Sequence, residues 1–294
     1  MPDPRPPGGR LSVQKTYKLF LAGAFPRSES GRSYPVSDAR GALLAHAALA
    51  SRKDARDAVV AARRAQPGWA AASAYNRGQV LYRVAELLED RHAQFAEAVA
   101  AGEGLDGADA EAVVAETVDR WVWYAGWADK IAQVAGSSNP VAGPWFNFSV
   151  PEPVGVVAAL APQRSSLLGL AGVVAPLLAA GNAVVVVASE ERPLPAVTLS
   201  EVLATSDVPP GVVNVLTGRT RELAPVLAAH RDVDGLDLAG AGPELAAELE
   251  RASAGNLKRV LTPRGGEEDW WAMPSTRRML TFVETKTAWH PVGV

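Results

Sequence analysis

The sequence predicts an open, doubly wound α/β domain with a parallel sheet, and two observations support this prediction. Five short apolar runs rich in β-branched residues recur along the chain, at 154–160, 183–189, 212–216, 235–239 and 257–261. Continuous apolar runs are typical of strands that are covered on both faces. Segments of helix length separate them, at 165–180, 194–206, 220–230 and 242–254. Strands that alternate with helices indicate crossover connections, and such sheets bind nucleotides at the carboxyl ends of their strands.

The N-terminal part is predicted to contain a tail followed by two strands. Residues 1–16 begin with MPDPRPPGGR, which lacks the apolar stretch of a signal peptide. We therefore expect a disordered tail and a cytoplasmic protein. Residues 17–144 are expected to form strands and helices of the same α/β domain. They begin with two short strands within 17–36, around a Ser/Gly-rich turn.

Three helices are predicted to follow. The first begins after Ser51, because Asp54 three residues later completes a capping-box pattern, and Pro67-Gly68 end it. Two further helices follow from apolar residues at helical spacing, at 74–101 and 108–134. The last contains the aromatic run 121–127, WVWYAGW. We interpret this run as helix packing on the sheet rather than as a platform for bases, because its context is not basic.

Two extended segments flank the core. Residues 145–153 are typical of an extended segment that leads into the core, 154–266. A polar linker, 267–278, precedes a last segment, 279–294, with a strand at roughly 279–289. Neither face of its FVETKTA run is continuously apolar, which favours an edge strand. This strand pairs either with a neighbouring chain or with the chain's own extended segment.

Composition excludes several classes of function. With 294 residues, 48% of them apolar and 21% charged, the chain can bury a sizeable core. A net charge of −3 does not indicate a surface for nucleic acid or an anionic membrane. The sequence contains no cysteine, which excludes disulfides, thiolate metal sites and a thiol nucleophile. The four histidines lack metal-ligand spacing, so no metal site is predicted; they are His46, His92, His230 and His290.

One uncharged stretch, 165–189, is long enough to be a membrane span. Gly181-Asn182 in its middle, followed shortly by a run of valines, indicates instead a helix end and a buried strand. We therefore expect neither a membrane nor a nucleic acid as partner.

Four motifs together carry a family resemblance. EPVGVVAALAP, PLLAAGNAVVVVASEERP, PPGVVNVLTG and NLKRV followed by GG resemble the Rossmann-like cofactor domain of NAD(P)-dependent aldehyde dehydrogenases, over about 17–266. The resemblance implies that a catalytic domain follows the position of Gly265-Gly266 and that a final arm completes a neighbouring subunit's sheet. Here TFVETKTAW resembles that arm only a short distance after the glycines. The chain is thus similar to the shortened second module of two-module "family 16" aldehyde dehydrogenases, lacking the catalytic domain, and 145–153 and 279–294 are its oligomerisation elements.

The resemblance also implies that the catalytic positions are substituted. The family reaction uses a cysteine thiolate, and this chain has none. The family's Pro-Trp-Asn motif, whose asparagine holds the oxyanion, reads Pro162-Gln163-Arg164 here. Pro263 stands where the general-base glutamate belongs, and proline cannot move a proton. We predict no catalytic residue.

The cofactor positions implied by the resemblance are only partly kept. The resemblance implies that a lysine and a glutamate hold the adenosine ribose. Val187 stands in place of the lysine, and Glu190 is the glutamate. Glu190 either accepts hydrogen bonds from the ribose hydroxyls or is a charged residue at the start of a helix. The phosphate turn begins with Gly240 and includes Gly242, but Glu244 adds negative charge and Leu245 replaces a glycine. The vestigial cofactor-binding candidates are Pro162, Glu190, Gly240 and Gly242. No cofactor is expected, with weak NAD(P) binding as the alternative.

The function predicted from these residues is that of a catalytically inactive aldehyde dehydrogenase homologue acting as an interaction subunit. Its partner is a full-length aldehyde dehydrogenase or a second copy of the chain. Removing 279–294 is expected to leave a folded domain that no longer assembles. The rival hypotheses are an NAD(P)-dependent oxidoreductase acting on aldehydes, alone or as a subunit, and a nucleotide sensor without chemistry.

Overall fold

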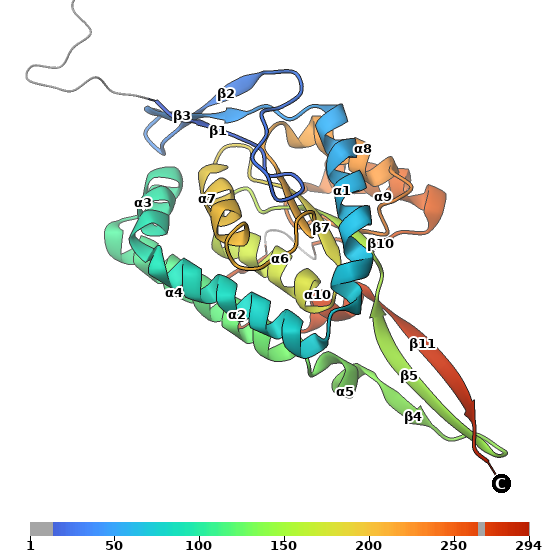
Figure 1. The fold of residues 1–294 in the computed structure, drawn as a ribbon. Helices are drawn as coiled ribbons and strands as arrows, with labels where there is room; N and C mark the ends of the chain where they lie inside the picture. The colour runs from blue at the N-terminus through green and yellow to red at the C-terminus, as the bar shows by residue number, and fades with distance from the viewer. Residues whose placement is uncertain (1–13, 264–267, 294) are drawn as a thin grey trace, which may run out of the picture.

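The centre of the molecule is a five-stranded parallel sheet, seen in a computed structural model that describes residues 14–263 and 268–293. The strand order is β10-β9-β6-β7-β8. Figure 1 shows β7 and β10 of this sheet among the surrounding helices. Its strands are β6 Val156–Leu160, β7 Ala183–Val187, β8 Val213–Leu216, β9 Gly235–Asp237 and β10 Arg259–Leu261. Every neighbouring pair is parallel, which confirms the predicted doubly wound sheet.

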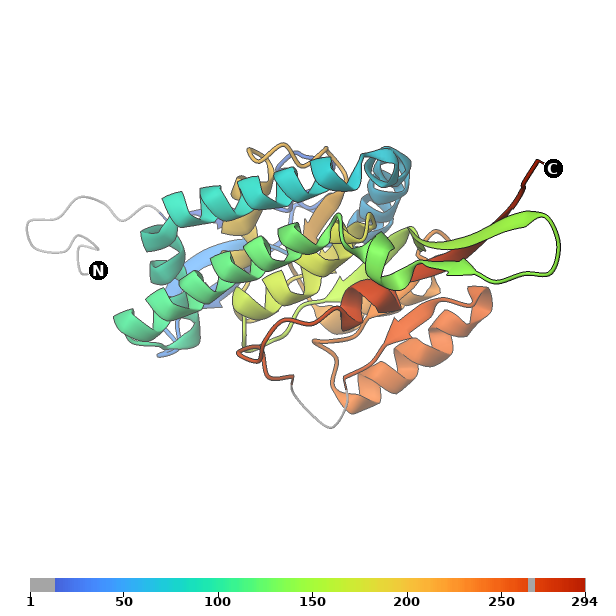
Figure 2. The ribbon, with the colours of Figure 1, turned by 90° about the horizontal axis from the view of Figure 1, so that it is seen from below.

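A three-stranded antiparallel arm projects from one end of this domain (Figure 2). Its strands, in the order β11-β5-β4, are β4 Ser137–Asn139, β5 Trp145–Pro153 and β11 Val283–Pro291. The last strand therefore pairs with the chain's own 145–153 segment, the second of the two predicted arrangements. The prediction of a strand from 279 is wrong at its start, because α10, Arg277–Thr281, comes first. Met279 in this helix is fully buried, and its packing holds α10 against the core.

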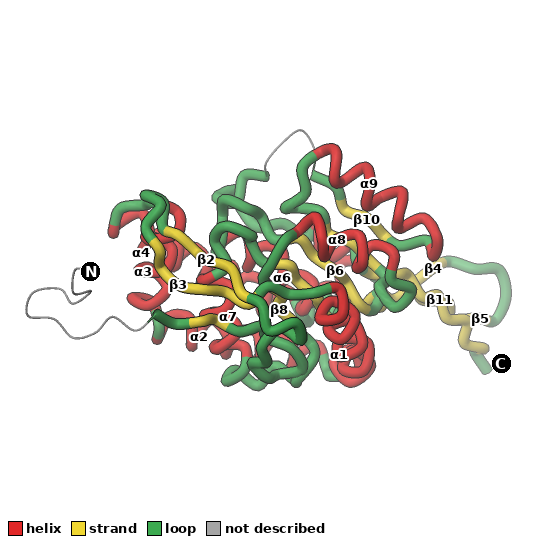
Figure 3. Tube along the Cα trace, turned by 90° about the horizontal axis from the view of Figure 1, so that it is seen from above, coloured by secondary structure: helices red, strands yellow, loops and turns green. Residues whose placement is uncertain are grey.

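A second small sheet lies at the N-terminus (Figure 3). Its strands, in the order β1-β3-β2, are β1 Thr16–Tyr17, β2 Ser33–Ser37 and β3 Leu43–Ala48. Thr16, inside the predicted tail, thus belongs to a strand, and residues 1–13 lie outside the described part. Strand β3 is absent from the prediction, because its alanine-rich sequence has low strand propensity. It is held between the two other strands and packs against Leu194.

The first helix, α1 Arg52–Ala71, carries the predicted capping box. The Ser51 side chain accepts hydrogen bonds from the amides of Lys53 and Asp54, and the Asp54 carboxylate accepts one from the Ser51 amide at 2.8 Å. The prediction that Pro67-Gly68 end the helix is wrong, since it continues to Ala71. Tertiary contact explains the extension: Trp69 is 2% exposed and its Nε1 donates to the Leu178 carbonyl at 3.1 Å. This contact offsets the backbone bond that proline cannot make.

Two predicted helices are each split in the structure. The region 74–101 forms α2 Ala74–Asp90 and α3 His92–Glu103, and 108–134 forms α4 Gly107–Trp127 and α5 Ile131–Ala135. Neither glycine nor proline marks the break at Arg91, so periodicity alone cannot locate it. The remaining helices are α6 Leu168–Ala179, α7 Leu194–Leu203, α8 Thr220–Ala229 and α9 Pro243–Ser253, with a 3₁₀ turn at Ala254–Asn256.

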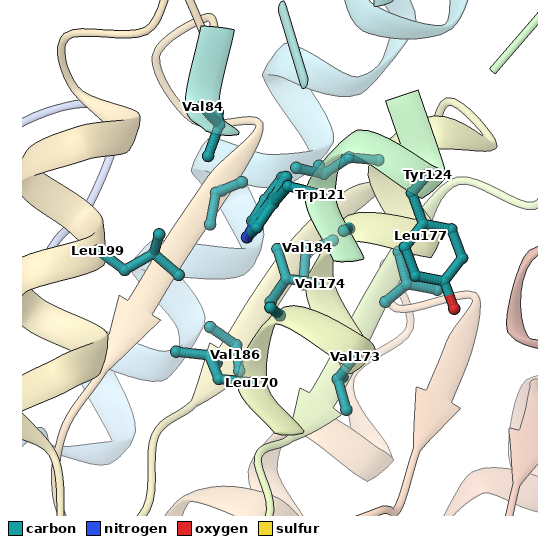
Figure 4. Close-up of a cluster of buried hydrophobic side chains, with 14 of the residues drawn as sticks. Val84, Trp121, Tyr124, Leu170, Val173, Val174, Leu177, Val184, Val186 and Leu199 are labelled. Carbon is teal, nitrogen blue, oxygen red and sulfur yellow. The ribbon is translucent and has the colours of Figure 1, made fainter. Parts of the chain in front are cut away.

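Helices cover both faces of the central sheet, and alternate strand residues serve the two faces. Val184 and Val186 pack with α2, α4, α6 and α7, whereas Val185 and Val187 pack with α1, α8 and α9. Figure 4 shows Trp121 of α4 above Val174 and Val184. Trp121 is fully buried, as expected for packing rather than ligand stacking.

The uncharged stretch 165–189 is buried almost throughout and forms α6, a turn and β7. Over 14–263 and 268–293, none of the helices is both long and apolar enough to span a bilayer. In the same ranges, no three His, Cys, Asp or Glu side chains gather in a way that could hold a metal ion.

Candidate functional site

A cavity of about 800 Å³ opens at the carboxyl ends of β6, β9 and β10. This volume is within the range of small-molecule sites, and the position is where doubly wound sheets bind ligands. Three of the four predicted cofactor-binding residues line it, namely Pro162, Gly240 and Gly242. The fold therefore brings these three together from the loops that follow β6 and β9.

Gly240 is required by the backbone rather than by a ligand. Its amide donates to the Leu160 carbonyl at 2.8 Å, which holds the turn after β9 against the end of β6. A Cβ at this position would lie 2.0 Å from the Ala161 carbonyl oxygen, far inside contact distance. A Cβ at Gly242 would have no neighbouring heavy atom within 4 Å.

The two glycines give a matched pair of substitutions. Gly240→Ala is expected to lower the free energy of unfolding by about 1–3 kcal/mol, the usual cost of overpacking. Gly242→Ala should change it by less than about 0.5 kcal/mol, because the site is open and its φ of −68° suits alanine. Urea unfolding monitored by circular dichroism measures both, and equal effects would contradict the assignment.

Glu190 does not line this cavity. It lies at a second cavity, of about 420 Å³, beside Tyr34 and Arg219. One Glu190 oxygen accepts from Arg219 Nη1 at 2.6 Å, and the other accepts from the Thr220 amide at 3.0 Å. Its carboxylate thus stabilises the N-terminus of α8, the role of a helix-entry charge. The hydrogen bond and charge of Glu190 raise the pKa of Arg219.

Gln163 closes the gap between the loops that follow β6 and β7. Its Nε2 donates to the Ala161 carbonyl at 3.1 Å, and its Oε1 accepts from the Glu190 amide at 2.9 Å. Ser189 Oγ donates to the Gln163 carbonyl at 2.9 Å. Val187, where the resemblance places a lysine, is 1% exposed and belongs to the core. These hydrogen bonds therefore join the loop after β6, which lines the larger cavity, to the loop after β7 that carries Glu190.

The two residues expected to oppose an anion at the phosphate turn lie elsewhere. The Glu244 side chain is 86% exposed and pairs with Arg221 at 3.2 Å, between the starts of α8 and α9. Leu245 is buried in the core against α1 and α8. Neither side chain lines the cavity. Helix α9 directs the Glu244 side chain toward solvent and the Leu245 side chain into the core.

Few groups among the described lining residues could perform chemistry. Pro263 lines the cavity wall and has no ionisable group, while Gly265-Gly266 lie outside the described residues. Sequence reasoning missed Thr262 and Glu250, which also line the cavity, with the Thr262 hydroxyl donating to the Glu250 carboxylate. Glu250 lies in α9 and Thr262 directly follows β10, and this position in neighbouring elements is the only sequence signal that could have suggested the pair. A hydroxyl beside a carboxylate has the elements of a nucleophile and a base.

The segment expected to be a polar linker, 267–278, is packed against the domain over its described part, 268–278. The Trp270 ring is 5% exposed and covers Gly172, where a Cβ would lie 2.9 Å from it. Arg120 Nη2 donates to the Trp270 carbonyl at 2.8 Å. Tyr124 Oη donates to the Ser275 carbonyl at 3.2 Å, and burial raises the pKa of Tyr124 to about 12.

A buried ion cluster joins this segment to the central sheet. Arg278 Nε donates to the Asp237 carboxylate at the end of β9 at 2.6 Å, and Asp237 is 0% exposed. The same guanidinium donates twice to Glu268, at 2.8 Å each. Burial alone raises the pKa of Glu268, but the hydrogen bonds from Arg278 and the charges of Arg278, Arg277 and Arg120 together lower it by more. Glu268, inside the segment predicted to be a polar linker, is therefore part of a buried ion cluster instead.

Comparison with known proteins places these features in a family. The family model described as the aldehyde dehydrogenase family matches residues 26–281. The chain is 34% identical over 265 residues to a mitochondrial benzaldehyde dehydrogenase of Antirrhinum majus, covering 87% of this chain and 48% of that protein. It is 34% identical over 272 residues to retinal dehydrogenase 2 of Homo sapiens, covering 91% of this chain and 51% of the relative.

Solved structures agree with this match. HpcC from Thermus thermophilus superposes with a TM-score of 0.78 at 31% identity, over 84% of this chain and 47% of HpcC. An NAD+ complex of an aldehyde dehydrogenase from Bacillus cereus gives 0.79 at 26% identity, over 84% and 50%. The chain spans about half the length of the curated relatives it matches. Because the family model covers most of its residues, the protein belongs to the aldehyde dehydrogenase family.

Proposed function

We propose that this chain is a catalytically inactive aldehyde dehydrogenase homologue that acts in the cytoplasm as an oligomerisation subunit for a full-length aldehyde dehydrogenase. The observation that supports this most is the arm: β11 runs along β5 for nine residues, and its other edge is unpaired within the described part of the chain. Unpaired strand edges invite association through their backbone groups. The likeness to the shortened "family 16" module, without the catalytic domain, belongs to the same proposal.

The composition of the cavity supports the absence of catalysis. The sequence has no cysteine to attack an aldehyde, and Pro263 stands at the general-base position that the resemblance implies. Thr262 and Glu250 lack, among the described residues, the third group that would orient a base, and neither is deeply buried. A surface carboxylate has little power to activate a hydroxyl, because its pKa lies far below that of the alcohol.

The purified chain is expected to oxidise no aldehyde with NAD or NADP and to hydrolyse no activated ester above a heat-treated control. The physical reason is the missing thiolate. Absorbance of NADH and of released nitrophenol measures the two reactions. Thr262→Val is the informative variant: turnover that it abolishes would identify Thr262 as a substitute nucleophile and overturn the proposal.

Assembly is tested by light scattering after size exclusion. The chain alone, and mixed with a full-length aldehyde dehydrogenase from the same cell, should form oligomers that include it. A chain that remains monomeric under both conditions, from low to high concentration, contradicts the proposed role.

An NAD(P)-dependent oxidoreductase is the second candidate, and dinucleotide binding without chemistry is a third. Both are favoured by the cavity beside Pro162, Gly240 and Gly242. The ion pair of Glu190 with Arg219 and the bridge made by Gln163 oppose them. Loss of one charge-assisted contact weakens binding at least roughly tenfold, so calorimetry should detect no low-micromolar NAD affinity. Low-micromolar affinity abolished by Glu190→Ala would favour these candidates.

A further inference from the structure

A tyrosine-lined groove lies between α2 and α4, and it shares no lining residue with the candidate site. Figure 1 shows these two helices side by side. The groove has a volume of about 320 Å³, and it is lined by Tyr75 and Tyr82 of α2 and Val122 of α4. Tyr75 is 68% exposed and Tyr82 is 49% exposed, so both rings are open to solvent. Exposed apolar side chains gathered at one place on a surface are typical of interaction sites.

Two glycines set the shape of this groove. A Cβ at Gly78 would lie 3.0 Å from the Ala125 carbonyl oxygen, so Gly78 lets the two helices approach closely. A Cβ at Gly126 would have no neighbouring heavy atom within 4 Å, although Gly126 lines the groove. Gly126 therefore leaves the groove open, and a larger side chain at this position would enter it from an unobstructed Cβ.

The spacing of the two tyrosines matches the repeat of a polyproline II helix. Tyr75 and Tyr82 are seven residues apart in α2, which is about 10 Å along the helix axis. A polyproline II helix repeats every three residues, about 9 Å. Such segments dock in grooves lined by aromatic side chains, and their carbonyls make no internal hydrogen bonds. The Tyr75 and Tyr82 hydroxyls and the Gln79 side-chain amide can donate to those carbonyls, since they form no hydrogen bond with another described residue.

The chain carries a segment of suitable composition near its N-terminus. Residues 2–7 read PDPRPP, and proline fixes φ near the value of a polyproline II helix. Pro4 and Pro7 are three residues apart, so such a helix would carry both on one face. This face repeats at the same interval as the two tyrosines of the groove.

The described part of the chain begins close enough for this segment to reach the groove. Lys15 Nζ and Arg91 Nη1 each lie 3.5 Å from the Glu201 carboxylate, which places the first described residues beside the C-terminal end of α2. Tyr82 lies nine positions before Arg91, about 14 Å along the helix axis. Pro7 lies eight positions before Lys15, and a polyproline II segment of that length spans about 25 Å. The excess length suffices to cross α2, which is about 10 Å wide with its side chains.

We propose that residues 2–7 of this chain dock as a polyproline II helix in the groove between α2 and α4. The segment enters from the C-terminal end of α2, so Pro7 contacts Tyr82 and Pro4 contacts Tyr75. The docked segment covers both exposed rings and closes the groove to other proline-rich chains. The arm and the candidate site take no part in this docking, so it is independent of the proposed function.

The residues that follow the proline run fit this placement. Gly8-Gly9 accommodate the bend between the groove and the first described residues, because glycine adopts backbone conformations that other residues avoid. Arg10 comes next in the chain, and Asp119 lies one turn before Val122 on the same face of α4. Asp119 is exposed and forms no ion pair with another described residue, so it is available to Arg10. A surface pair of this kind adds little affinity, but it favours the direction of docking given above.

Peptide binding tests the docking in the full chain. Replacing Pro4 and Pro7 with serine removes the two proposed proline contacts and vacates the groove. A fluorescein-labelled peptide of residues 1–13 should then bind this variant. It should bind the parent chain at least about tenfold more weakly, because a tethered segment acts at millimolar effective concentration. Fluorescence anisotropy measures both affinities, and equal affinities, or no binding to either chain, overturn the inference.

Two glycine substitutions in the serine variant locate the binding site. Gly126→Leu should abolish peptide binding, because the leucine side chain enters the groove. Gly107→Leu is the matched control at another exposed glycine of α4 with no heavy atom within 4 Å of its Cβ position, and it should leave binding unchanged. Leucine has a higher helix propensity than glycine, and circular dichroism checks that both chains remain folded. Equal peptide affinities in the two chains would place the site elsewhere and overturn the inference.

Cysteine cross-linking tests the path of the segment in a chain that has no other cysteine. Gly9→Cys combined with Glu86→Cys, one turn beyond Tyr82 in α2, should form a disulfide within one chain under mild oxidation. Gly9→Cys combined with Lys53→Cys, at an exposed position of α1, should not. Mass spectrometry identifies the linked peptides. The reverse result, no disulfide in either variant, or a disulfide that joins two chains overturns docking within one chain.

Discussion

Replacing Arg278 with alanine is expected to lower the free energy of unfolding by about 3–5 kcal/mol, the usual cost of breaking a buried ion pair by removing one partner. The guanidinium contacts Asp237 at 2.6 Å and Glu268 at 2.8 Å, and it lies 4.9 Å from the Trp270 ring. Burial lowers the pKa of Arg278, but the two carboxylates raise it by more. Without the arginine, the fully buried Asp237 carboxylate loses its counter-charge.

Chemical denaturation of the variant and the parent chain measures this effect. Arg83→Ala is the control, because Arg83 pairs with Glu86 at 3.0 Å on an exposed helix face and such pairs contribute less than about 1 kcal/mol. The parent should also lose stability as pH falls below about 4.5, the ordinary pKa of a glutamate, since the folded state lowers the pKa of Glu268. Equal losses of unfolding free energy in Arg278→Ala and Arg83→Ala would show that the ion cluster of Arg278, Asp237 and Glu268 does not stabilise the packing of segment 268–278.

The central sheet could be predicted from sequence because its signals are local. Continuous runs of valine and alanine between helix-length segments leave a buried parallel sheet as the natural arrangement. The capping box at Ser51 is equally local, since both partners lie within one turn. Pro67 shows the limit of such reasoning, because the helix continues past it through a contact between Trp69 and Leu178, which lies far away in the chain.

The packed segment 268–278 could not be predicted for the same reason. Its anchor joins Arg278 to Asp237, which is 41 positions earlier, and neither residue stands in a recognisable motif. In the candidate site, Pro162, Gly240 and Gly242 line one cavity because they follow neighbouring strands. Glu190 also follows a strand, but Arg219 and the start of α8 decide where its carboxylate points.

The boundary between the domain and the arm is expected to lie after Phe282, four residues later than the boundary after residue 278 that the sequence predicts. Met279 and Phe282 are both fully buried. The Phe282 ring packs on Gly235, where a Cβ would lie 2.7 Å from it. The Phe282 carbonyl accepts from the Asn182 side chain at 3.0 Å as well as from the Val154 amide. These groups belong to the core, whereas most side chains of β11 are exposed.

Two truncations separate these contributions. A chain that ends at Arg278 loses both buried side chains, which together contribute about 5–10 kcal/mol, as much as the whole stability of many domains. It should be insoluble or lack a cooperative thermal transition, contrary to the expectation that removing 279–294 leaves a folded domain. A chain that ends at Val283 keeps both side chains and should unfold cooperatively, yet lose assembly through β11, because β5 then forms the edge of the arm in its place. Circular dichroism and light scattering measure the two properties, and a folded chain ending at Arg278 would disprove this boundary.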